Sequence, residues 1–276
     1  MKSMSMADKA ARFAEMKRRG EPIAMLTAYD APMARAEAAA RVDILLVGDS
    51  VGTNMLGYAS EQEVTLADMA HHTRAVRRGA PDAFVISDLP VATYETPTEA
   101  VANARVLAEA GADMVKFEGC RPAIVEALVG AGFAVCGHLG LEPQHHAEKR
   151  LKGKQAGEAH QLVEAALTME KAGIAMLVLE LIPEEVAEIV TQRLKVPTIG
   201  IGAGRATDGQ VLVICDVLGY TKAAFRHNKR YAEVGETMEA AARAYVGDVH
   251  SKAFPAAANA FPMNKEQLPE FLASLA

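Results

Sequence analysis

The sequence predicts a (β/α)₈ TIM barrel with a short N-terminal helix and a peripheral C-terminal tail. Short apolar, β-branched runs alternate along the chain with longer segments of helical periodicity. Eight such units follow one another without a break in composition, and 276 residues is an ordinary length for one barrel. We therefore expect a single domain over residues 1–276, with the barrel core at about residues 22–250.

The expected strands are the apolar runs. They are Ile23–Ala28, Ile44–Val47, Phe84–Ser87, Met114–Phe117, Ala134–Gly137, Met176–Leu179 and Thr198–Ile201. An eighth run, Val211–Ile214, fits a strand or a buried helix equally well. Three helices are expected to end at an Ala-Gly pair directly before a strand, at 110–111, 131–132 and 172–173, because glycine readily adopts the left-handed conformation. Thr96 to Glu99 is a capping box that predicts a helix start.

Composition excludes several classes of function. A net charge of −6 and a pI near 5.8 argue against a nucleic-acid groove or a polybasic membrane anchor. No apolar run approaches the ~18 residues that a membrane span needs, and the first residues lack the apolar core of a secretory signal. They fit a short amphipathic helix with Ala7, Phe13 and Met16 near one face. Three cysteines without CxxC spacing are expected to be free, buried or partly buried thiols in a reducing cytoplasm.

Polar residues recur where the predicted strands end, and in a barrel the loops after the strands form the active-site face. In chain order they are Asp49 and Ser50, Asp88, Lys116 and Glu118, His138, and Glu180. Carboxylates gathered on one rim repel one another unless a cation or protonation compensates. A hard divalent ion such as Mg²⁺ prefers such oxygen ligands and keeps waters or substrate oxygens alongside them. Asp49, Asp88 and Glu118 are therefore the candidate metal ligands.

Each of these residues also has an ordinary structural explanation. Asp49 and Asp88 could cap the helices that follow them, and Lys116 could be an ion-pair partner for Glu118. His138 by itself is more often a hydrogen-bonded core histidine than a catalyst. One polar group at each of several successive strand ends favours a site. The glycine-rich stretch 200–210 matches no phosphate-binding motif in register and predicts a close-packed turn after the seventh strand.

Several long strings, in order from about Leu26 to about Tyr220, resemble the ketopantoate hydroxymethyltransferase (3-methyl-2-oxobutanoate hydroxymethyltransferase) family. The strings are TAYDAPMAR, LVGDSVGTNMLGY, DMAHHTRAVRRGAP, SDLP, GADMVKFEG, VCGHLGLEPQ, LVLELIP and IGIGAGRATDGQVLV. The resemblance implies a (β/α)₈ barrel of the phosphoenolpyruvate mutase and isocitrate lyase superfamily, usually a cytoplasmic homodecamer. It implies transfer of a hydroxymethyl group from 5,10-methylenetetrahydrofolate to 3-methyl-2-oxobutanoate with Mg²⁺, in pantothenate biosynthesis.

The resemblance also implies a role for each matching residue. Asp49 and Asp88 would bind both metal and substrate, and Glu118 would belong to the metal site directly or through water. Ser50, Lys116 and His138 would contact the substrate, with Lys116 at its carboxylate. Glu180 would be the general base that removes the proton next to the ketone, which fits a carboxylate in a fairly dry barrel mouth.

The chain departs from the family pattern in two places. The stretch Gln144–Gln155, which is expected to be a mobile loop, reads HHAEKRLKGKQ after GLEPQ, and the ending reads FPAAANAFPMNKEQ. The intact acidic residues favour 2-oxo acid activation, whereas these departures concern the electrophile, the 2-oxo acid and the oligomer. A related Mg²⁺-dependent aldolase or lyase, and a non-catalytic barrel that binds a 2-oxo acid, are therefore the alternatives.

Overall fold

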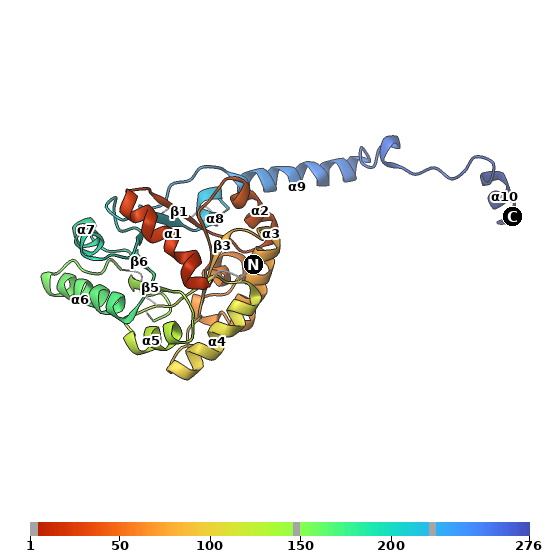
Figure 1. Cartoon of the computed structure of the whole chain (residues 1–276). Helices are drawn as coiled ribbons and strands as arrows, with labels where there is room; N and C mark the ends of the chain where they lie inside the picture. Colours follow the sequence, from red (N-terminus) through yellow and green to blue (C-terminus); the bar gives the residue numbers. More distant parts are fainter. Residues whose placement is uncertain (1–4, 146–149, 221–224) are drawn as a thin grey trace. The chain divides into compact units, whose positions relative to one another are not determined.

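A computed structural model describes residues 5–145, 150–220 and 225–276. Its eight parallel strands close into a barrel in the order β1 to β8, which confirms the predicted fold class (Figure 1). The strands are β1 Ile23–Thr27, β2 Ile44–Val47, β3 Phe84–Asp88, β4 Met114–Lys116, β5 Val135–Gly140, β6 Met176–Glu180, β7 Thr198–Ile201 and β8 Gly209–Leu212. The longer helices are α1 Met6–Arg19, α2 Ala31–Ala39, α3 Leu66–Gly79, α4 Pro97–Ala110, α5 Pro122–Gly130, α6 Ala156–Ala172, α7 Glu184–Arg193 and α9 Val234–Ser251. Shorter helices are η1 Gly52–Leu56, η2 Glu61–Glu63, α8 Ile214–Leu218, η3 Ala257–Asn259 and α10 Leu268–Ala273.

The ambiguous eighth run divides between two elements. Residues Val211 and Leu212 end β8, and Ile214 begins α8, so the strand starts two residues earlier than predicted, at Gly209. A Cβ at Gly209 would lie 2.4 Å from the carbonyl oxygen of Ile23, which explains why a glycine stands where β8 meets β1. The other strands agree with the prediction to within three residues. Strand β5 runs on to Gly140, so His138 lies inside it rather than after it.

The helix boundaries follow the predicted caps. Thr96 accepts a hydrogen bond from the Glu99 amide at 3.2 Å, but the Glu99 carboxylate accepts from the amide of Glu95 rather than from that of Thr96. Gly111 and Gly173 end α4 and α6 with φ of 114° and 109°, in the left-handed region expected of them. Helices α3 to α7 lie outside the strands, as Figure 1 shows.

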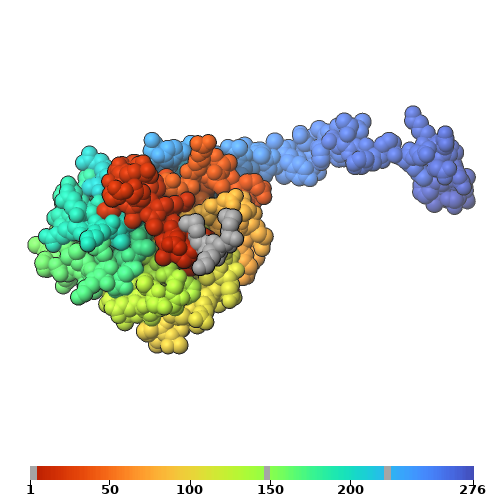
Figure 2. All heavy atoms as spheres, in the orientation of Figure 1, coloured from red at the N-terminus to blue at the C-terminus, as the bar shows by residue number. Residues whose placement is uncertain are grey.

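Helix α1 covers the end of the barrel where the strands begin. Phe13 is fully buried there and packs edge-on against Phe84, with ring centroids 4.9 Å apart. Ala10 is the second buried residue of α1. Ala7 is exposed, so placing it near the same face as Phe13 was wrong, while Met16 is partly buried and packs against the core. Figure 2 shows this N-terminal segment (red) lying over the barrel face turned towards the viewer.

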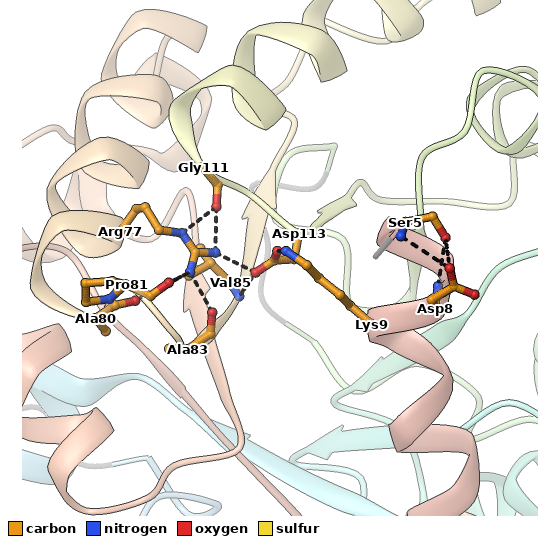
Figure 3. A network of polar contacts seen from close by, with 10 residues as sticks. All are labelled: Ser5, Asp8, Lys9, Arg77, Ala80, Pro81, Ala83, Val85, Gly111 and Asp113. Carbon is orange, nitrogen blue, oxygen red and sulfur yellow. Dashed lines mark hydrogen bonds and ion pairs between the residues drawn. The ribbon is translucent and has the colours of Figure 1, made fainter. Parts of the chain in front are cut away.

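A polar network joins α1 to the start of the strands (Figure 3). Asp113, directly before β4, accepts hydrogen bonds from Lys9 at 2.6 Å, from the Val85 amide at 3.0 Å and from Arg77. The Arg77 guanidinium also donates to the carbonyl oxygens of Gly111, Ala80, Pro81 and Ala83. Because its donors meet acceptors in two chain segments, 80–83 before β3 and 111–113 before β4, Arg77 links these segments at the N-terminal end of the barrel.

By its internal contacts the chain divides into two compact units, residues 1–217 with 223–229, and residues 218–222 with 230–276. The barrel strands all lie in the first unit. The second contains α9 and α10, and its described residues after 235 are all exposed, as expected for the tail after Phe254. The single-domain assignment stays a prediction. In the described ranges no helix has the length and apolar composition needed to cross a bilayer.

The three cysteines are free thiols, as predicted. Cys136 and Cys215 are buried, but Cys120 is exposed, which differs from the expectation that all three would be at least partly buried.

Candidate active site

The residues singled out from the sequence converge on the C-terminal end of the barrel. Asp88, Lys116 and Glu180 are the last residues of β3, β4 and β6. Asp49 and Glu118 each follow two residues after a strand, β2 and β4, respectively. All of these side chains are buried except that of Glu180, whose side chain keeps a fifth of its surface exposed.

Asp88 and Lys116 form a buried ion pair because they are register partners on neighbouring strands. The Lys116 ammonium donates to Asp88 Oδ2 at 2.9 Å, and the Asp49 amide approaches the same oxygen at 3.3 Å. Burial by itself disfavours the charged lysine, but the carboxylates of Asp88, Asp49 and Glu118 outweigh it and raise its pKa. Lys116 therefore remains a fixed positive charge. Its hydrogen-bonded partner is Asp88 rather than Glu118.

Asp49 and Glu118 are acidic groups that burial makes reluctant to ionise. Desolvation raises the pKa of Asp49, and the charge of Asp88 raises it further. Desolvation likewise raises the pKa of Glu118 well above its ordinary value, with Asp49 adding to the effect. A bound cation would reverse this preference by stabilising both carboxylates in their charged form.

The explanation of Asp49 and Asp88 as helix caps is not supported. Val51 is the N-cap of η1 and no side chain caps that helix, while Thr96 caps α4, the helix after β3. The Asp88 carboxylate instead accepts from the Asp49 backbone amide at 3.3 Å, and the Asp49 carboxylate accepts from the Gln144 side chain at 2.6 Å.

His138 stands between two carboxylates. Its Nε2 lies 3.1 Å from Glu180 Oε2, and its Nδ1 lies 3.5 Å from Glu118 Oε1. Neither contact has hydrogen-bond geometry, so both ring nitrogens are buried without a hydrogen-bond partner in the described parts of the chain. A core histidine would have its nitrogens satisfied, so His138 is better explained as a residue that faces a ligand.

Ser50 and the backbone around it are closely packed. The Ser50 hydroxyl shares a 2.8 Å hydrogen bond with the hydroxyl of Tyr29, which is fully buried. Burial raises the pKa of Tyr29, so its hydroxyl keeps its proton. A Cβ at Gly48 would lie 3.1 Å from Ser50 Oγ and 3.7 Å from Asp88 Oδ2, so the chain approaches these side chains without a bulky neighbour.

Sequence reasoning missed Gln144, which was expected in a mobile loop beginning at that residue. It is 2% exposed, and its side-chain nitrogen donates to Asp49 Oδ2 at 2.6 Å. Its main-chain amide donates to Glu118 Oε2 at 2.9 Å. The only available signal was its place in the GLEPQ string. Part of that predicted loop, 146–149, lies outside the described residues.

The donor set fits a divalent metal that retains other ligands. Among the described residues, no three side chains of His, Cys, Asp or Glu are arranged to hold an ion alone. Asp88 Oδ1, however, is buried and without a hydrogen-bond partner there, directly beside Asp49 and Lys116. Two or three carboxylate oxygens supplemented by water or substrate oxygens match the preference of Mg²⁺.

The glycine-rich stretch after β7 and the His71-His72 pair on α3 have structural surroundings. The turn after β7 is close-packed, because a Cβ at Gly202 would lie 2.6 Å from the Leu181 side chain, and one at Gly204 would lie 2.4 Å from that of Glu184. His71 is exposed on α3, whereas His72 is half-buried and contacts the Tyr29 carbonyl oxygen at 2.6 Å.

Comparison with known proteins identifies the group to which this barrel belongs. The sequence profile of the ketopantoate hydroxymethyltransferase family matches residues 8–257. The chain belongs to the ketopantoate hydroxymethyltransferase family. It is 47% identical over 268 residues to the 3-methyl-2-oxobutanoate hydroxymethyltransferase of Roseiflexus sp. (strain RS-1), covering 95% of this chain and 96% of that one. The relative from Desulfotalea psychrophila (strain LSv54 / DSM 12343) is 48% identical over 254 residues, covering 89% and 91%.

As a member of the ketopantoate hydroxymethyltransferase family, the chain is an enzyme, which confirms the family resemblance. Similar solved structures include a phosphonopyruvate hydrolase in complex with oxalate and Mg²⁺, at 13% identity and a TM-score of 0.63, covering 99% of this chain and 98% of the other. Another is 2,3-dimethylmalate lyase, a phosphoenolpyruvate mutase/isocitrate lyase superfamily member, at 16% identity and a TM-score of 0.59, covering 97% and 94%. At these identities the likeness concerns the fold.

Proposed function

We propose that the chain transfers a hydroxymethyl group from 5,10-methylenetetrahydrofolate to 3-methyl-2-oxobutanoate, forming 2-dehydropantoate (ketopantoate) for pantothenate biosynthesis. The reaction follows from the name shared by its relatives at 47% and 48% identity. The structural observation that supports it most is that the buried acidic cluster of Asp49, Asp88 and Glu118 lies at the same end of the barrel as Glu180. His138 stands between Glu118 and Glu180.

Asp49 and Asp88 are proposed as the firmer metal ligands, with Glu118 third, directly or through water. Bound there, Mg²⁺ would act as a Lewis acid towards the keto oxygen and carboxylate of the substrate. The orphaned Asp88 Oδ1 and the raised pKa of Asp49 and Glu118 support this role, since each favours a cation nearby.

Lys116 is proposed to orient the 2-oxo acid through its carboxylate. The ammonium is buried and permanently charged, so it attracts an anion without needing to gain a proton. Ser50 and His138 would contact the same substrate. The Tyr29 hydroxyl fixes the Ser50 side chain, and the two ring nitrogens of His138, which lack hydrogen-bond partners in the described ranges, leave it able to donate or accept.

Glu180 is the proposed general base. It is the most exposed carboxylate of the set and hydrogen-bonds to no cation within the described residues, so it is available to take a proton from substrate. It would remove the proton from the substrate carbon next to the ketone. That carbon would then form the new carbon–carbon bond to the methylene group carried by folate. Water would supply the hydroxyl group of the product as the bonds from that methylene carbon to the folate nitrogens break, and tetrahydrofolate would leave with the substrate proton and the second proton of water.

We also infer a homo-oligomer, a decamer by family resemblance, acting in the cytoplasm on small molecules rather than on nucleic acid or membranes. Large apolar side chains of the second unit support association, because exposed apolar surface of this extent is unusual for a monomer. They include Met238, Tyr245, Val246, Phe261 and Phe271, all of them at least 47% exposed.

Product formation tests the proposal. The purified chain with Mg²⁺, methylenetetrahydrofolate and 3-methyl-2-oxobutanoate should yield ketopantoate, detected by mass spectrometry. A well-folded protein that forms none at saturating substrates would refute it. Folate-independent cleavage of ketopantoate or of a related acid would instead support the aldolase or lyase alternative.

A further inference from the structure

We infer that Gln144 is a positioning residue that holds Asp49 and Glu118 in place for ligand binding and ties the loop after β5 to the acidic cluster. It lies in the GLEPQ string, but neither that string nor a strand end assigns it a role in the site. The inference rests on the proposed function only where turnover is measured, because its main readout is metal binding.

Gln144 uses every polar group it has on the site or its surroundings. The side-chain nitrogen donates to Asp49 Oδ2 at 2.6 Å and to the Leu89 carbonyl oxygen at 3.0 Å. Its side-chain oxygen accepts from the Tyr94 hydroxyl. Its main-chain amide donates to Glu118 Oε2 at 2.9 Å, and its carbonyl oxygen accepts from Gln62 at 3.1 Å. A single buried residue thus contacts two of the three proposed metal ligands.

The orientation of the amide follows from its partners. The Leu89 carbonyl oxygen can only accept, so the nitrogen of Gln144 must face it and the oxygen must face Tyr94. In that orientation the nitrogen also reaches Asp49. Tyr94 is fully buried, and its hydroxyl is 3.0 Å from His145 Nε2. Its hydroxyl also donates to the Gln144 side-chain oxygen, so Tyr94 fixes the orientation of the amide.

Gln144 donates a hydrogen bond to one carboxylate oxygen of Asp49 and to one of Glu118, and it does not contact the other oxygen of either group. Among the described residues, Asp49 Oδ1 and Glu118 Oε1 make no hydrogen bond; Oε1 only approaches His138 Nδ1 at 3.5 Å. An amide that fixes one carboxylate oxygen orients the second oxygen towards a ligand. Removing such supporting contacts typically weakens metal binding about 10–100-fold.

The start of the loop is fixed independently. Gly140 has φ of 110°, and a Cβ there would lie 2.1 Å from the carbonyl oxygen of Glu180. The Leu141 amide donates to that same oxygen at 2.8 Å. The segment from 140 to 144 therefore runs from beside the proposed base to the acidic cluster, and Gln144 is where it attaches.

The test compares Gln144→Met with Gln155→Met. Methionine has a similar length but donates no hydrogen bond, and Gln155 is an exposed residue of the same loop without a capping bond. Titration with Mn²⁺, followed by electron paramagnetic resonance, should show a Kd about 10–100-fold higher for Gln144→Met and an unchanged Kd for Gln155→Met. The KM for the 2-oxo acid should rise as well. A Gln144→Met Kd within about twofold of wild type would overturn the inference.

Tyr94→Phe provides a second variant if Gln144→Met does not fold. It keeps the ring and removes the hydroxyl, and should weaken Mn²⁺ binding about threefold to tenfold. The double variant should bind no more weakly than Gln144→Met alone, because Tyr94 acts through Gln144. Effects that multiply, or a Tyr94→Phe protein with normal affinity, would contradict the assignment. A wild-type protein that binds Mn²⁺ yet forms no ketopantoate would refute the proposed function alone.

Discussion

Where the barrel strands begin, Asp113 accepts from Arg77, Lys9 and the Val85 amide, and Arg77 donates to four carbonyl oxygens as well. Where the strands end, Asp88 Oδ1 and both ring nitrogens of His138 are buried with no hydrogen-bond partner in the described chain. A buried unpaired polar group costs about 1–3 kcal/mol. The first end therefore stabilises the fold, whereas the second gives up stability that a metal ion and substrate would restore on binding.

The largest expected effect of a substitution falls at the end where the strands finish. Asp88→Asn removes a proposed metal ligand, and should lower kcat/KM for ketopantoate formation roughly 10³-fold, equivalent to ~4 kcal/mol. The free energy of unfolding should fall as well, by about 3 kcal/mol, because the buried Lys116 ammonium loses its ion-pair partner, so kcat/KM is compared on folded protein. Activity within about tenfold of wild type at saturating Mg²⁺ would show that Asp88 is no ligand.

At the end of the barrel where the strands begin, we expect a substitution to lower stability without lowering activity. Arg77→Met should lower the free energy of unfolding by about 3 kcal/mol, because it removes one of the three donors to Asp113 and leaves several carbonyl oxygens without their side-chain donor. Urea denaturation measures this loss, and kcat below the melting temperature should stay at the wild-type value. A large fall in kcat with unchanged stability would remove the distinction between the two ends.

Glu37 provides a test of whether a buried polar group without a hydrogen-bond partner is always part of a functional site. It lies on α2, is 5% exposed, and both of its carboxylate oxygens lack hydrogen-bond partners in the described residues. Burial raises its pKa from 4.5 to about 8, and Asp30 adds to the effect. The contribution of Glu37 to the free energy of unfolding is therefore fully present below pH 4.5, and it is lost as the pH rises to about 8.

Glu37→Gln should then raise the free energy of unfolding by roughly 2 kcal/mol at pH 9 and change it little at pH 4. Product formation should be unaffected, since Glu37 is on a helix rather than at a strand end. Equal stability of the two proteins across this pH range would mean that Glu37 has a partner in solution.

The smallest expected effect concerns the exposed edge of the polar network. Lys9 pairs with Asp113 at 2.6 Å, but its side chain is 45% exposed. Lys9→Met should lower the free energy of unfolding by only ~0.5 kcal/mol, since water screens such pairs. A loss as large as that of Arg77→Met would show that the ammonium, rather than the guanidinium, holds the network together.

The sequence predicted the strands and the residues at their ends because both depend on local patterns. The alternation of apolar runs and helices located seven strands closely. The polar residues near their ends gave the candidate site residues, which are Asp49, Ser50, Asp88, Lys116, Glu118, His138 and Glu180. The pairing of Lys116 with Asp88 could not be read in this way, because it depends on the register between β3 and β4. Lys116 and Glu118, two apart in sequence, looked like the natural pair.

Gln144 could not be predicted for a related reason. Its contact with Asp49 joins residues 95 positions apart, and a loop glutamine has no periodic signal. Helix α1 illustrates a smaller limit. The expected face included Ala7, but Phe13 is buried together with Ala10. A helix whose apolar residues are mostly alanines allows more than one choice of buried face, and the packing of Phe13 against Phe84 decides between them.

Solvent-deuterium exchange into 3-methyl-2-oxobutanoate tests the metal and the base together, without any electrophile. The wild-type protein should exchange the hydrogen next to the ketone in a Mg²⁺-dependent way, and Glu180→Gln should reduce the rate by at least about 10²-fold while the protein stays folded. Asp49→Ala and Asp88→Ala should each lose the Mg²⁺-dependent exchange. Exchange by Glu180→Gln at the wild-type rate, or full exchange by the wild type in the presence of a chelator, would contradict the role assigned to this end of the barrel.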